Sequence, residues 1–450
     1  MTGMLEDHFH SKTTEALIAN SMTEISLRLR SKRQLFFLLA AASFLCFLYI
    51  INIRVLVFPS FSLTCNTSFP SLHRSYDVWP DFHIKVFDHE TFKQECVPHG
   101  EYTISGIPDL LPAWSRSHNS HCRELYDKFT CIYAVEKRQG TVKIPDSFVL
   151  KVKDWLGNNN ELYQELYKQT SLLILFSLVR ITRESAINCD FCKYKNYTAE
   201  HEFGRLESDL SFSASNIFML DRLHAVITIK DHDPVNWSYE QYMDMMQLTN
   251  TWLDRAFQNE PTAKFPAIIW DLLPKSGSSQ LHPHNQVFLS PTRYQGMVEA
   301  WRRAAQDYFS DQHSNYFTDL ITIYSALGLA VPYKSAVALA SLTPRKDNEV
   351  VIIAPEAGDD FFQLIYYVLR GFMDDLKKFS FSLGGGYPAM DKDDKVGRIP
   401  AFVRIITRGV TTEIRTDISA LELFTATNVN IDPYKVVRSI QESLRKRSPR

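Results

Sequence analysis

Four residues in three separate segments place the tightest constraint on how this 450-residue chain can fold. Cys189 and Cys192 form a C-x-x-C pair, His232 follows a strand-like segment 40 residues after Cys192, and His282 lies another 50 residues on. Two thiolates and two imidazoles are the ligands of a closed tetrahedral zinc site. The pattern therefore predicts that one Zn²⁺ fastens three distant segments of the chain together.

Each of these ligands also has a plainer interpretation. Cys189 and Cys192 are suitably spaced for a disulfide in an oxidising compartment. His232 can be a surface residue, with His224 or His201 as the fourth ligand. The sequence leaves these alternatives open, and His232 is favoured because it ends a strand just before a helix.

The stretch "SGSSQLHPHNQ" adds a candidate nucleophile next to the metal site. Alternate residues of an extended segment point to the same face, so His282, His284 and Gln286 should project together. A neutral His284 imidazole can attack a phosphate and hold the transferred group as a phosphoramidate, which divides one displacement into two easier ones. Gln286 offers a neutral donor to a phosphoryl oxygen, while Gly277 and Ser279 let backbone N–H groups approach an anion. The plainer interpretation of His284 is a structural histidine.

Together these motifs resemble the galactose-1-phosphate uridylyltransferases, in the transferase branch of the histidine-triad superfamily. The shared pattern is C-x-x-C, a histidine at the end of a strand, and G-x-S-x-x-H-P-H-x-Q, and the resemblance extends from about residue 180 to the last helix. It implies that His284 is the nucleotidylated residue, with Ser279 and Gln286 against the phosphates. Asn216 and Phe218 fall where the family contacts the base and ribose. Glutamine in place of a third histidine implies transfer or phosphorolysis rather than hydrolysis.

Two positions depart from the family pattern. Asp271 stands where the family usually has an asparagine, and a carboxylate facing a phosphate repels it unless it is protonated or paired with a metal. Asp271 can also simply cap the following turn. The strand "FVRIITRG" lacks the H-x-H that often holds a second metal in the family, and its Arg404 and Arg408 can meet an acidic group on an acceptor instead.

We therefore expect a nucleotidyltransferase of the hexose-1-phosphate uridylyltransferase or nucleotide-sugar phosphorylase kind. It would move a nucleoside monophosphate from a nucleotide sugar to a phosphorylated acceptor through a nucleotidyl-His284 intermediate, with Zn²⁺ as cofactor. The alternative is a non-catalytic, zinc-stabilised protein of the secretory pathway that binds nucleotides or glycans. A net charge of −2 gives no reason to expect nucleic acid as a partner. Family members often form dimers, so the resemblance also allows a homodimer.

An uncharged apolar run at 35–51 predicts one membrane-spanning helix. At ~1.5 Å per residue the run spans ~25 Å, at the short end of the range. Four basic residues lie just before it and only Arg54 lies just after it, so the positive-inside rule places the N-terminus in the cytosol. A cleaved signal peptide is the competing interpretation. We expect a single-pass type II membrane protein with its catalytic part in the ER or Golgi lumen.

Glycosylation sequons and cysteines agree with a lumenal body. All three sequons follow the apolar run, at Asn66, Asn196 and Asn236. Outside the run and the C-x-x-C pair, an even number of cysteines remains, which favours two disulfides of open connectivity over four free thiols. These cysteines are Cys65, Cys96, Cys122 and Cys131.

The expected fold class is α+β, with two histidine-triad-like domains that have antiparallel sheets and packed helices, preceded by the single transmembrane helix. A strand–strand–helix–strand order is expected in both domains, and prolines should keep helices short before them. The predicted regions are a cytosolic tail (1–33), a transmembrane signal anchor (34–58), a stem and cysteine-bearing lead-in (59–140), an N-terminal nucleotidyltransferase domain (141–290) and a C-terminal domain (291–450).

Overall fold

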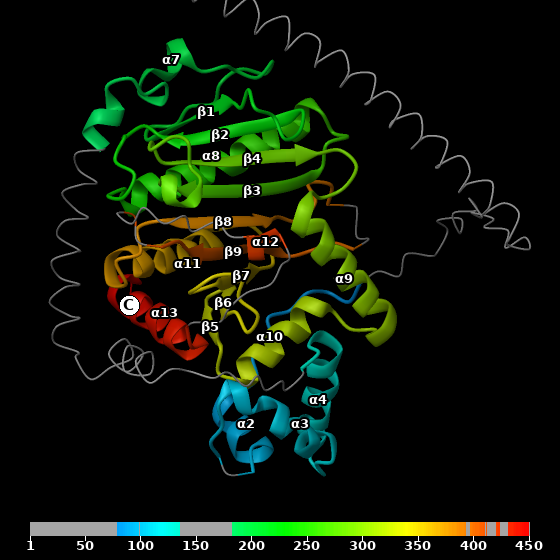
Figure 1. Ribbon diagram of the computed structural model, residues 1–450. Helices are drawn as coiled ribbons and strands as arrows, with labels where there is room; N and C mark the ends of the chain where they lie inside the picture. Colours follow the sequence, from blue (N-terminus) through cyan, green and yellow to red (C-terminus); the bar gives the residue numbers. More distant parts are fainter. Residues whose placement is uncertain are drawn as a thin grey trace, which may run out of the picture. The chain divides into compact units, whose positions relative to one another are not determined.

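One nine-stranded antiparallel sheet runs through the computed structural model (Figure 1). The structure describes residues 79–98, 100–135, 182–392, 397–409, 411, 420–423 and 431–449, which all lie within one compact unit. The sheet order is β1-β2-β4-β3-β8-β9-β7-β6-β5. The strands are β1 Ser211–Ser215, β2 Leu223–Ile229, β3 Phe265–Leu272, β4 His284–Ser290, β5 Ala330–Tyr333, β6 Ala336–Ala340, β7 Val350–Ala354, β8 Phe381–Gly386 and β9 Ala401–Thr407.

The helices pack around this sheet and at one of its edges. Short turns of 3₁₀ helix occur at η1 Ile104–Gly106, η2 Phe191–Lys193 and η3 Pro274–Ser276, and a π-helical turn, η4 Gly371–Asp375, extends α11. The α-helices are α2 His89–Cys96, α3 Ile107–Ser115, α4 Ser120–Ile132, α7 Tyr194–Tyr197, α8 Tyr239–Asn259, α9 Gly296–Gln312, α10 Tyr316–Ala326, α11 Asp359–Arg370, α12 Ala420–Leu423 and α13 Pro433–Arg447.

The two halves of the sheet repeat one pattern. The chain passes through β1, β2, α8, β3 and β4, and later through β6, β7, α11, β8 and β9. In the sheet, β1-β2-β4-β3 is followed by β8-β9-β7-β6, which is the same order reversed about the β3–β8 pair. This confirms the α+β class, the antiparallel pairing and the expected repeat. Both halves join one sheet, and the domain boundary at residue 290 stays a prediction.

A row of directly opposite residues crosses the whole sheet, and their side chains share one face. Asn285, which alternates with the row in β4, donates from Nδ2 to Thr249 Oγ1 of α8 at 3.1 Å. The side chains of the row therefore point away from α8. In sheet order its members are Ala214, Val226, Gln286, Ile269, Gly384, Arg404, Val351, Leu339 and Ala330.

Helix α8 covers the other face of β1, β2 and β4. It begins with a capping box. The Ser238 side chain accepts from the Gln241 N–H, and the Gln241 side chain accepts from the Ser238 N–H. Its apolar side buries Tyr242, Met245 and Trp252 completely. Burial of each such large side chain contributes roughly 1.5–3 kcal/mol.

The described part of the chain before the sheet is mainly helical. Three short helices, α2, α3 and α4, occupy 89–132 and lie beside α10 (Figure 1). Proline is compatible with the first turn of a helix, and Pro108 lies there in α3. A disulfide joins Cys96 of α2 to Cys122 of α4, whereas Cys131 is a free, exposed thiol. One of the expected disulfides is thus present; Cys65 lies outside the described residues.

The predicted membrane topology is corrected by the structure. Among the residues that it describes, no helix is both long enough and apolar enough to cross a bilayer. The longest, α8, carries charged residues along one side and packs on the sheet with the other. The expectation of a single-pass membrane protein with a lumenal catalytic part is therefore wrong by this finding. The apolar run on which it rested, within 34–58, lies outside the described residues.

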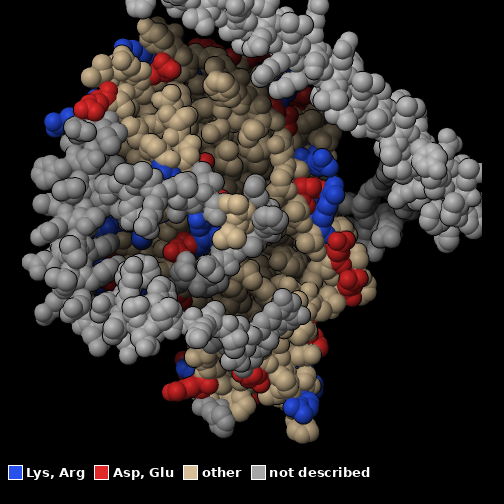
Figure 2. Space-filling model, viewed as in Figure 1, with Lys and Arg blue, Asp and Glu red and all other residues tan. Residues whose placement is uncertain are grey.

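Charges of both signs alternate on the face shown in Figure 2. Along α9, for example, Glu299 lies 2.8 Å from Arg302 and 2.9 Å from Arg303. The described surface over β1–β4 in this view carries few charged side chains.

Candidate metal centre and active site

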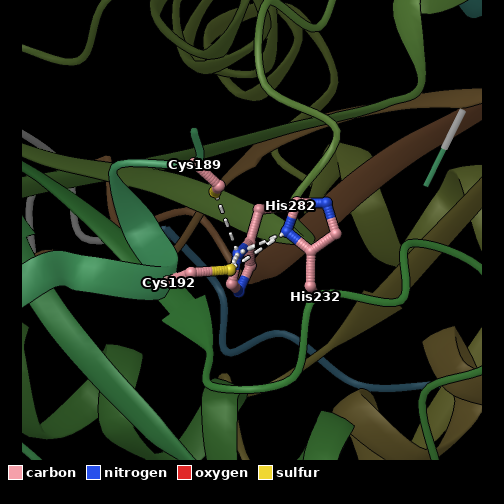
Figure 3. A group of neighbouring side chains, drawn as sticks. All are labelled: Cys189, Cys192, His232 and His282. Carbon is pink, nitrogen blue, oxygen red and sulfur yellow. Dashed lines mark hydrogen bonds between the residues drawn. The ribbon is translucent and has the colours of Figure 1, made fainter. Parts of the chain in front are cut away.

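The four predicted metal ligands converge on one point (Figure 3). Cys189 and Cys192 come from the turn before and within η2, His232 from the loop after β2, and His282 from the loop before β4. One ligand atom from each side chain lies within 4.8 Å of every other. This is the only such group of metal-binding side chains within the described ranges.

The distances suit a tetrahedral ion. His232 Nδ1 lies 3.1 Å from His282 Nδ1, and Cys192 Sγ lies 3.3 Å from His232 Nδ1. The two cysteine sulfurs lie 3.4 Å (Cys189) and 3.6 Å (Cys192) from His282 Nδ1. Bond lengths of ~2.3 Å to sulfur and ~2.0 Å to nitrogen require ligand atoms ~3.3–3.8 Å apart around such an ion. The residues therefore fit a bound metal.

Hydrogen bonds orient both imidazoles toward that point. His282 donates from Nε2 to the Ile229 carbonyl at 2.6 Å, which leaves Nδ1 free as a ligand. His232 Nε2 lies 2.9 Å from Ser185 Oγ, and that hydroxyl donates in turn to the Thr182 carbonyl at 3.0 Å. Such outer contacts fix the tautomer of metal-binding histidines. Sequence reasoning missed Ser185 and the Ile229 carbonyl, because neither belongs to a motif.

Burial favours the neutral forms of three of the ligand side chains. Burial, together with the neighbouring Cys189 sulfur, raises the pKa of the Cys192 thiol to about 11. Burial lowers the pKa of His282 to about 4 and lowers that of His232. A bound metal ion would reverse this preference at the sulfur ligands, because a coordinating thiol is deprotonated. Cys189 and Cys192 are both free, so the alternative of a disulfide between them is wrong.

The alternative fourth ligands lie elsewhere. His224 is fully buried in β2, where its Nδ1 accepts from the Leu220 N–H at 3.0 Å. His201 stacks on Phe203, with ring centroids 5.0 Å apart, and contacts Trp252. His232 is therefore the histidine that joins the cluster.

His284 is held in the tautomer that a nucleophile needs. It is the first residue of β4 and is only 9% exposed. Its Nδ1–H donates to the His282 carbonyl at 2.7 Å, so the lone pair is on Nε2. Burial lowers the pKa of this imidazole and favours its neutral form. The Phe191 ring, in the same segment as the cysteine ligands, packs edge-on 5.3 Å away.

A cavity of about 440 Å³ opens beside His284 on the face of the sheet that points away from α8. Its floor comes from β1–β4 and includes Ala214, Val226 and Ile269. It brings together five of the predicted site residues: Asn216, Phe218, Ser279, His284 and Gln286. The volume is in the range of small-molecule sites.

Polar contacts order one side of this cavity. Asn216 Nδ2 donates to Gln286 Oε1 at 2.9 Å, and Asn216 Oδ1 accepts from the Phe218 N–H at 2.9 Å. Strand β1 ends at Ser215, so Asn216 starts a loop. In that loop Phe218 is 83% exposed and Ile217 71% exposed, with Met219 and Leu220 also exposed. The cavity therefore has an apolar rim beside an amide pair.

The turn that precedes the motif closes the opposite side. Gly277 has φ 101°, in the left-handed region that favours glycine, and follows η3 directly. Ser279 and Gln280 then line the cavity, and Ser278 Oγ donates to the Gln280 carbonyl at 2.6 Å. Gly277 itself is not among the lining residues. Its contribution is the turn that brings Ser279 to the cavity.

Asp271 lies outside the described lining of the cavity. It is near the end of β3, opposite Ser382 of β8. Burial raises its pKa, while a hydrogen bond with Ser382 and the positive charge of Arg408 act in the other direction. Its role in substrate binding remains a prediction.

Arg404 of β9 and Arg408, just after this strand, are paired within the protein. Arg404 donates from Nε to the buried Glu349 at 2.5 Å. Arg408 donates from Nε to Ser382 Oγ at 3.0 Å and from Nη1 to Glu422 at 2.9 Å. Contact of Arg408 with an acceptor would require these bonds to rearrange.

No model of a known protein family matches the sequence, and no curated protein matches it. Solved structures do resemble it. A galt-like protein from Arabidopsis thaliana is 14% identical, with 56% of this chain and 91% of that chain covered at a TM-score of 0.44. An ADP-glucose phosphorylase from A. thaliana, solved with ADP-glucose bound, is 13% identical; the match covers 56% of this chain and 90% of that chain, at a TM-score of 0.45. A uridylyltransferase is 12% identical; the match covers 54% of this chain and 87% of that chain, at a TM-score of 0.45. At these values the activity has to be argued from the site itself.

Proposed function

We propose that this protein is a nucleotidyltransferase that forms a nucleotidyl-His284 intermediate. The substrate would be a nucleotide sugar, and the acceptor a sugar phosphate or inorganic phosphate. The observation that carries the proposal is the position of His284: its Nδ1–H donates to the His282 carbonyl, burial favours the neutral ring with a free Nε2, and the ring lies beside a cavity whose polar lining includes the amides of Asn216 and Gln286. A histidine with only a structural role would not require an open cavity beside it.

The first half-reaction follows from that geometry. His284 Nε2 attacks the α-phosphorus of the nucleotide sugar, and an N–P bond forms as the bond from phosphorus to the bridging oxygen breaks. The sugar phosphate leaves with the electron pair of that oxygen. The imidazole becomes positively charged, and the His282 carbonyl, as acceptor of the Nδ1–H bond, stabilises the charge.

The second half-reaction reverses these roles. A phosphate oxygen of the acceptor attacks phosphorus, the N–P bond breaks, and His284 is released as the neutral base. Gln286 is suited to hydrogen-bond a non-bridging phosphoryl oxygen through its Nε2, because its Oε1 is already occupied by Asn216. An amide neither donates a proton to the leaving group nor removes one from water. This favours transfer over hydrolysis.

We propose zinc as the ion held by Cys189, Cys192, His232 and His282, because a closed set of two thiolates and two imidazoles is typical of structural zinc. When bound, the ion supplies a rigid link between the cysteine segment and β4 and leaves no open position for substrate. His282 then fixes the backbone whose carbonyl orients His284.

The nucleoside would bind at the other end of the cavity. Asn216 and the exposed apolar residues of the 217–220 loop are suited to a ribose and a base, respectively. Apolar side chains that are exposed without a ligand lose water contact when a planar base covers them. This placement leaves the phosphates near His284.

The proposal is tested by trapping the intermediate. The purified chain is mixed with nucleotide sugars that carry ³²P in the α-phosphate, across uridine, adenosine and guanosine forms, without acceptor. A phosphohistidine-type adduct that is labile in acid and stable in base is expected, and acceptor should discharge it. His284→Ala should abolish the label, and His118→Ala, an exposed histidine far along the chain, should retain it.

Two results would separate the alternatives. If nucleotide sugars bind with an affinity that depends on Asn216 and none labels the protein, the chain is a non-catalytic binding protein. Labelling that persists in His284→Ala would place the nucleophile elsewhere and refute the proposed mechanism.

A further inference from the structure

A second cavity lies in the other half of the sheet. It has a volume of about 410 Å³, and residues of β6, β7 and β9 form its floor. Helices α9 and α10, the end of α4 and the loop after β6 supply its walls. None of its lining residues belongs to the proposed nucleotidyl site.

This cavity has the same place in its half of the sheet as the nucleotidyl cavity has in the other. Leu339, Val351 and Arg404 line it, and all three belong to the row that crosses the sheet. In the first half the same row lines the nucleotidyl cavity through Ala214, Val226, Gln286 and Ile269. By the reversed strand order, β9 corresponds to β4, so Arg404 stands where Gln286 stands in the first half.

The walls of the second cavity are aromatic. Tyr133, Trp301, Tyr316 and Tyr324 line it. The guanidinium of Arg404 lies over the Trp301 ring, 5.5 Å from its centroid, which stabilises both side chains in place. Aromatic faces of this kind bind the apolar faces of sugar and base rings.

Two arginines, Arg345 and Arg404, also line the cavity. Glu349, which is 2% exposed, accepts from Arg404 Nε and from the Arg345 N–H. That carboxylate balances the charge of Arg404. Glu349 and Glu422 attract the Arg345 guanidinium electrostatically, but its N–H groups make no hydrogen bond or ion pair among the described residues and are therefore available to a ligand. The Tyr316 hydroxyl likewise has no hydrogen-bond partner in the described part of the chain.

We propose that this cavity is a second binding site, which takes a phosphate ester of a sugar or nucleoside. The ring would lie against the aromatic walls, and the phosphate would meet Arg345 and the Tyr316 hydroxyl. Arg404 and Gln286 are three strands apart in the row, roughly 14 Å at ~4.8 Å per strand. The second ligand therefore lies too far from His284 for direct attack on phosphorus and binds independently of the transfer reaction.

Calorimetric titration of the full chain tests this inference. The probes are glucose 1-phosphate, AMP, inorganic phosphate and glucose. An ester should bind at least tenfold more tightly than inorganic phosphate or glucose, and Arg345→Gln should weaken that binding at least tenfold. Arg293→Gln, which removes an exposed arginine elsewhere, should leave it unchanged. Arg345→Lys should recover part of the affinity, because it restores the charge without the planar fork.

Binding at the first cavity is distinguished by Asn216→Ala. Binding at the second cavity should survive this substitution and also His284→Ala, whichever ester is bound. If ester binding depends on Asn216 and not on Arg345, or if no ester binds, the second site does not exist. Equal affinities for inorganic phosphate and the esters would refute a role for the aromatic walls. Thermal melting of each variant confirms that a loss of binding is not a loss of fold.

Discussion

His284 Nδ1 lies 2.7 Å from the carbonyl oxygen of His282, two residues earlier in the chain. The same His282 contributes its own Nδ1 to the metal cluster and donates from Nε2 to Ile229. One backbone group thus links the ring that would bind the metal to the ring that would attack phosphorus. If His282 were displaced, its carbonyl would no longer hold the proton of His284 on Nδ1. Metal binding and nucleophile orientation are therefore coupled over a few ångströms.

We predict that Cys189→Ser removes both the metal and the labelling of His284. Near one zinc per wild-type chain is expected, with little or none in the variant, because serine is a poor zinc ligand. Loss of the ion should lower the melting temperature as well, since metal binding contributes to folding. Elemental analysis, thermal melting and α-phosphate labelling measure the three effects.

The matched control for that prediction is Cys131→Ser. Cys131 is a free, exposed thiol outside the cluster, so its substitution should leave zinc content and labelling unchanged. A Cys189→Ser protein that keeps full zinc occupancy would contradict the four-residue site.

Gln286→Glu should slow the formation of the intermediate. Glutamate keeps an oxygen that can accept from Asn216 Nδ2, so the substitution mainly adds a negative charge facing the phosphates. Repulsion of about 2 kcal/mol corresponds to roughly a thirtyfold lower rate constant. Rapid-quench labelling measures it. Gln312→Glu adds the same charge at an exposed site and should have no effect, and equal rates in Gln286→Glu and wild type would remove Gln286 from the phosphate site.

Asp271→Asn should stabilise the protein at neutral pH. Burial raises the folded-state pKa of Asp271 above its ordinary value of 3.8. The protonated carboxyl therefore contributes fully to folding stability below about pH 3.8. This contribution is lost as the pH rises through the raised pKa of the folded state. Above it, the buried carboxylate opposes folding, and asparagine removes that cost. Urea unfolding between pH 3.5 and 7.5 should show the gain at the upper end only.

Asp360→Asn is the comparison variant, because it should change the stability at neutral pH in the opposite direction. A hydrogen bond from Ser335 and an ion pair with Lys334 help to lower the pKa of Asp360, so its contribution is present above 3.8 and is lost in acid. Its replacement should weaken folding slightly at pH 7. A pH profile for Asp271→Asn parallel to that of the wild type would contradict the assignment of Asp271 as a buried, destabilising carboxylate.

Gly385→Ala should destabilise the sheet. A Cβ at this position would lie 2.0 Å from the Phe402 carbonyl oxygen and 2.7 Å from Val403 Cα, so β8 and β9 would have to separate. A cost of about 3 kcal/mol or more is expected from such overpacking. At the neighbouring Gly384 the nearest atom would be 3.7 Å away, and Gly384→Ala should change the free energy of unfolding by less than about 0.5 kcal/mol. Denaturant unfolding compares the two variants.

The candidate site was largely predictable because its chemistry depends on motifs. The spacing of Cys189, Cys192 and His282 was sufficient to predict a metal cluster, and His232 joins it as expected. Alternation in an extended segment placed His284 and Gln286 on one face, and both line the same cavity.

Other features leave no local pattern in the sequence. Strand β8 contains three consecutive glycines, which disfavour a strand, and it forms because β3 and β9 flank it closely. Strand β5 is only four residues long. The outer contacts of the metal histidines and the second cavity depend on residues far apart in the chain, such as Arg345 and Trp301. Only the assembled fold brings them together.

The pairing of β3 with β8 extends over six residues of each strand, from Ala267 opposite Gly386 to Leu272 opposite Phe381. Any rotation of one half against the other would break this ladder of main-chain hydrogen bonds. A hinge between the halves that opened and closed the nucleotidyl cavity would have to break these hydrogen bonds. We therefore expect substrate entry to be controlled at the rim of the cavity, where the side chains of Ile217, Phe218 and Met219 are exposed.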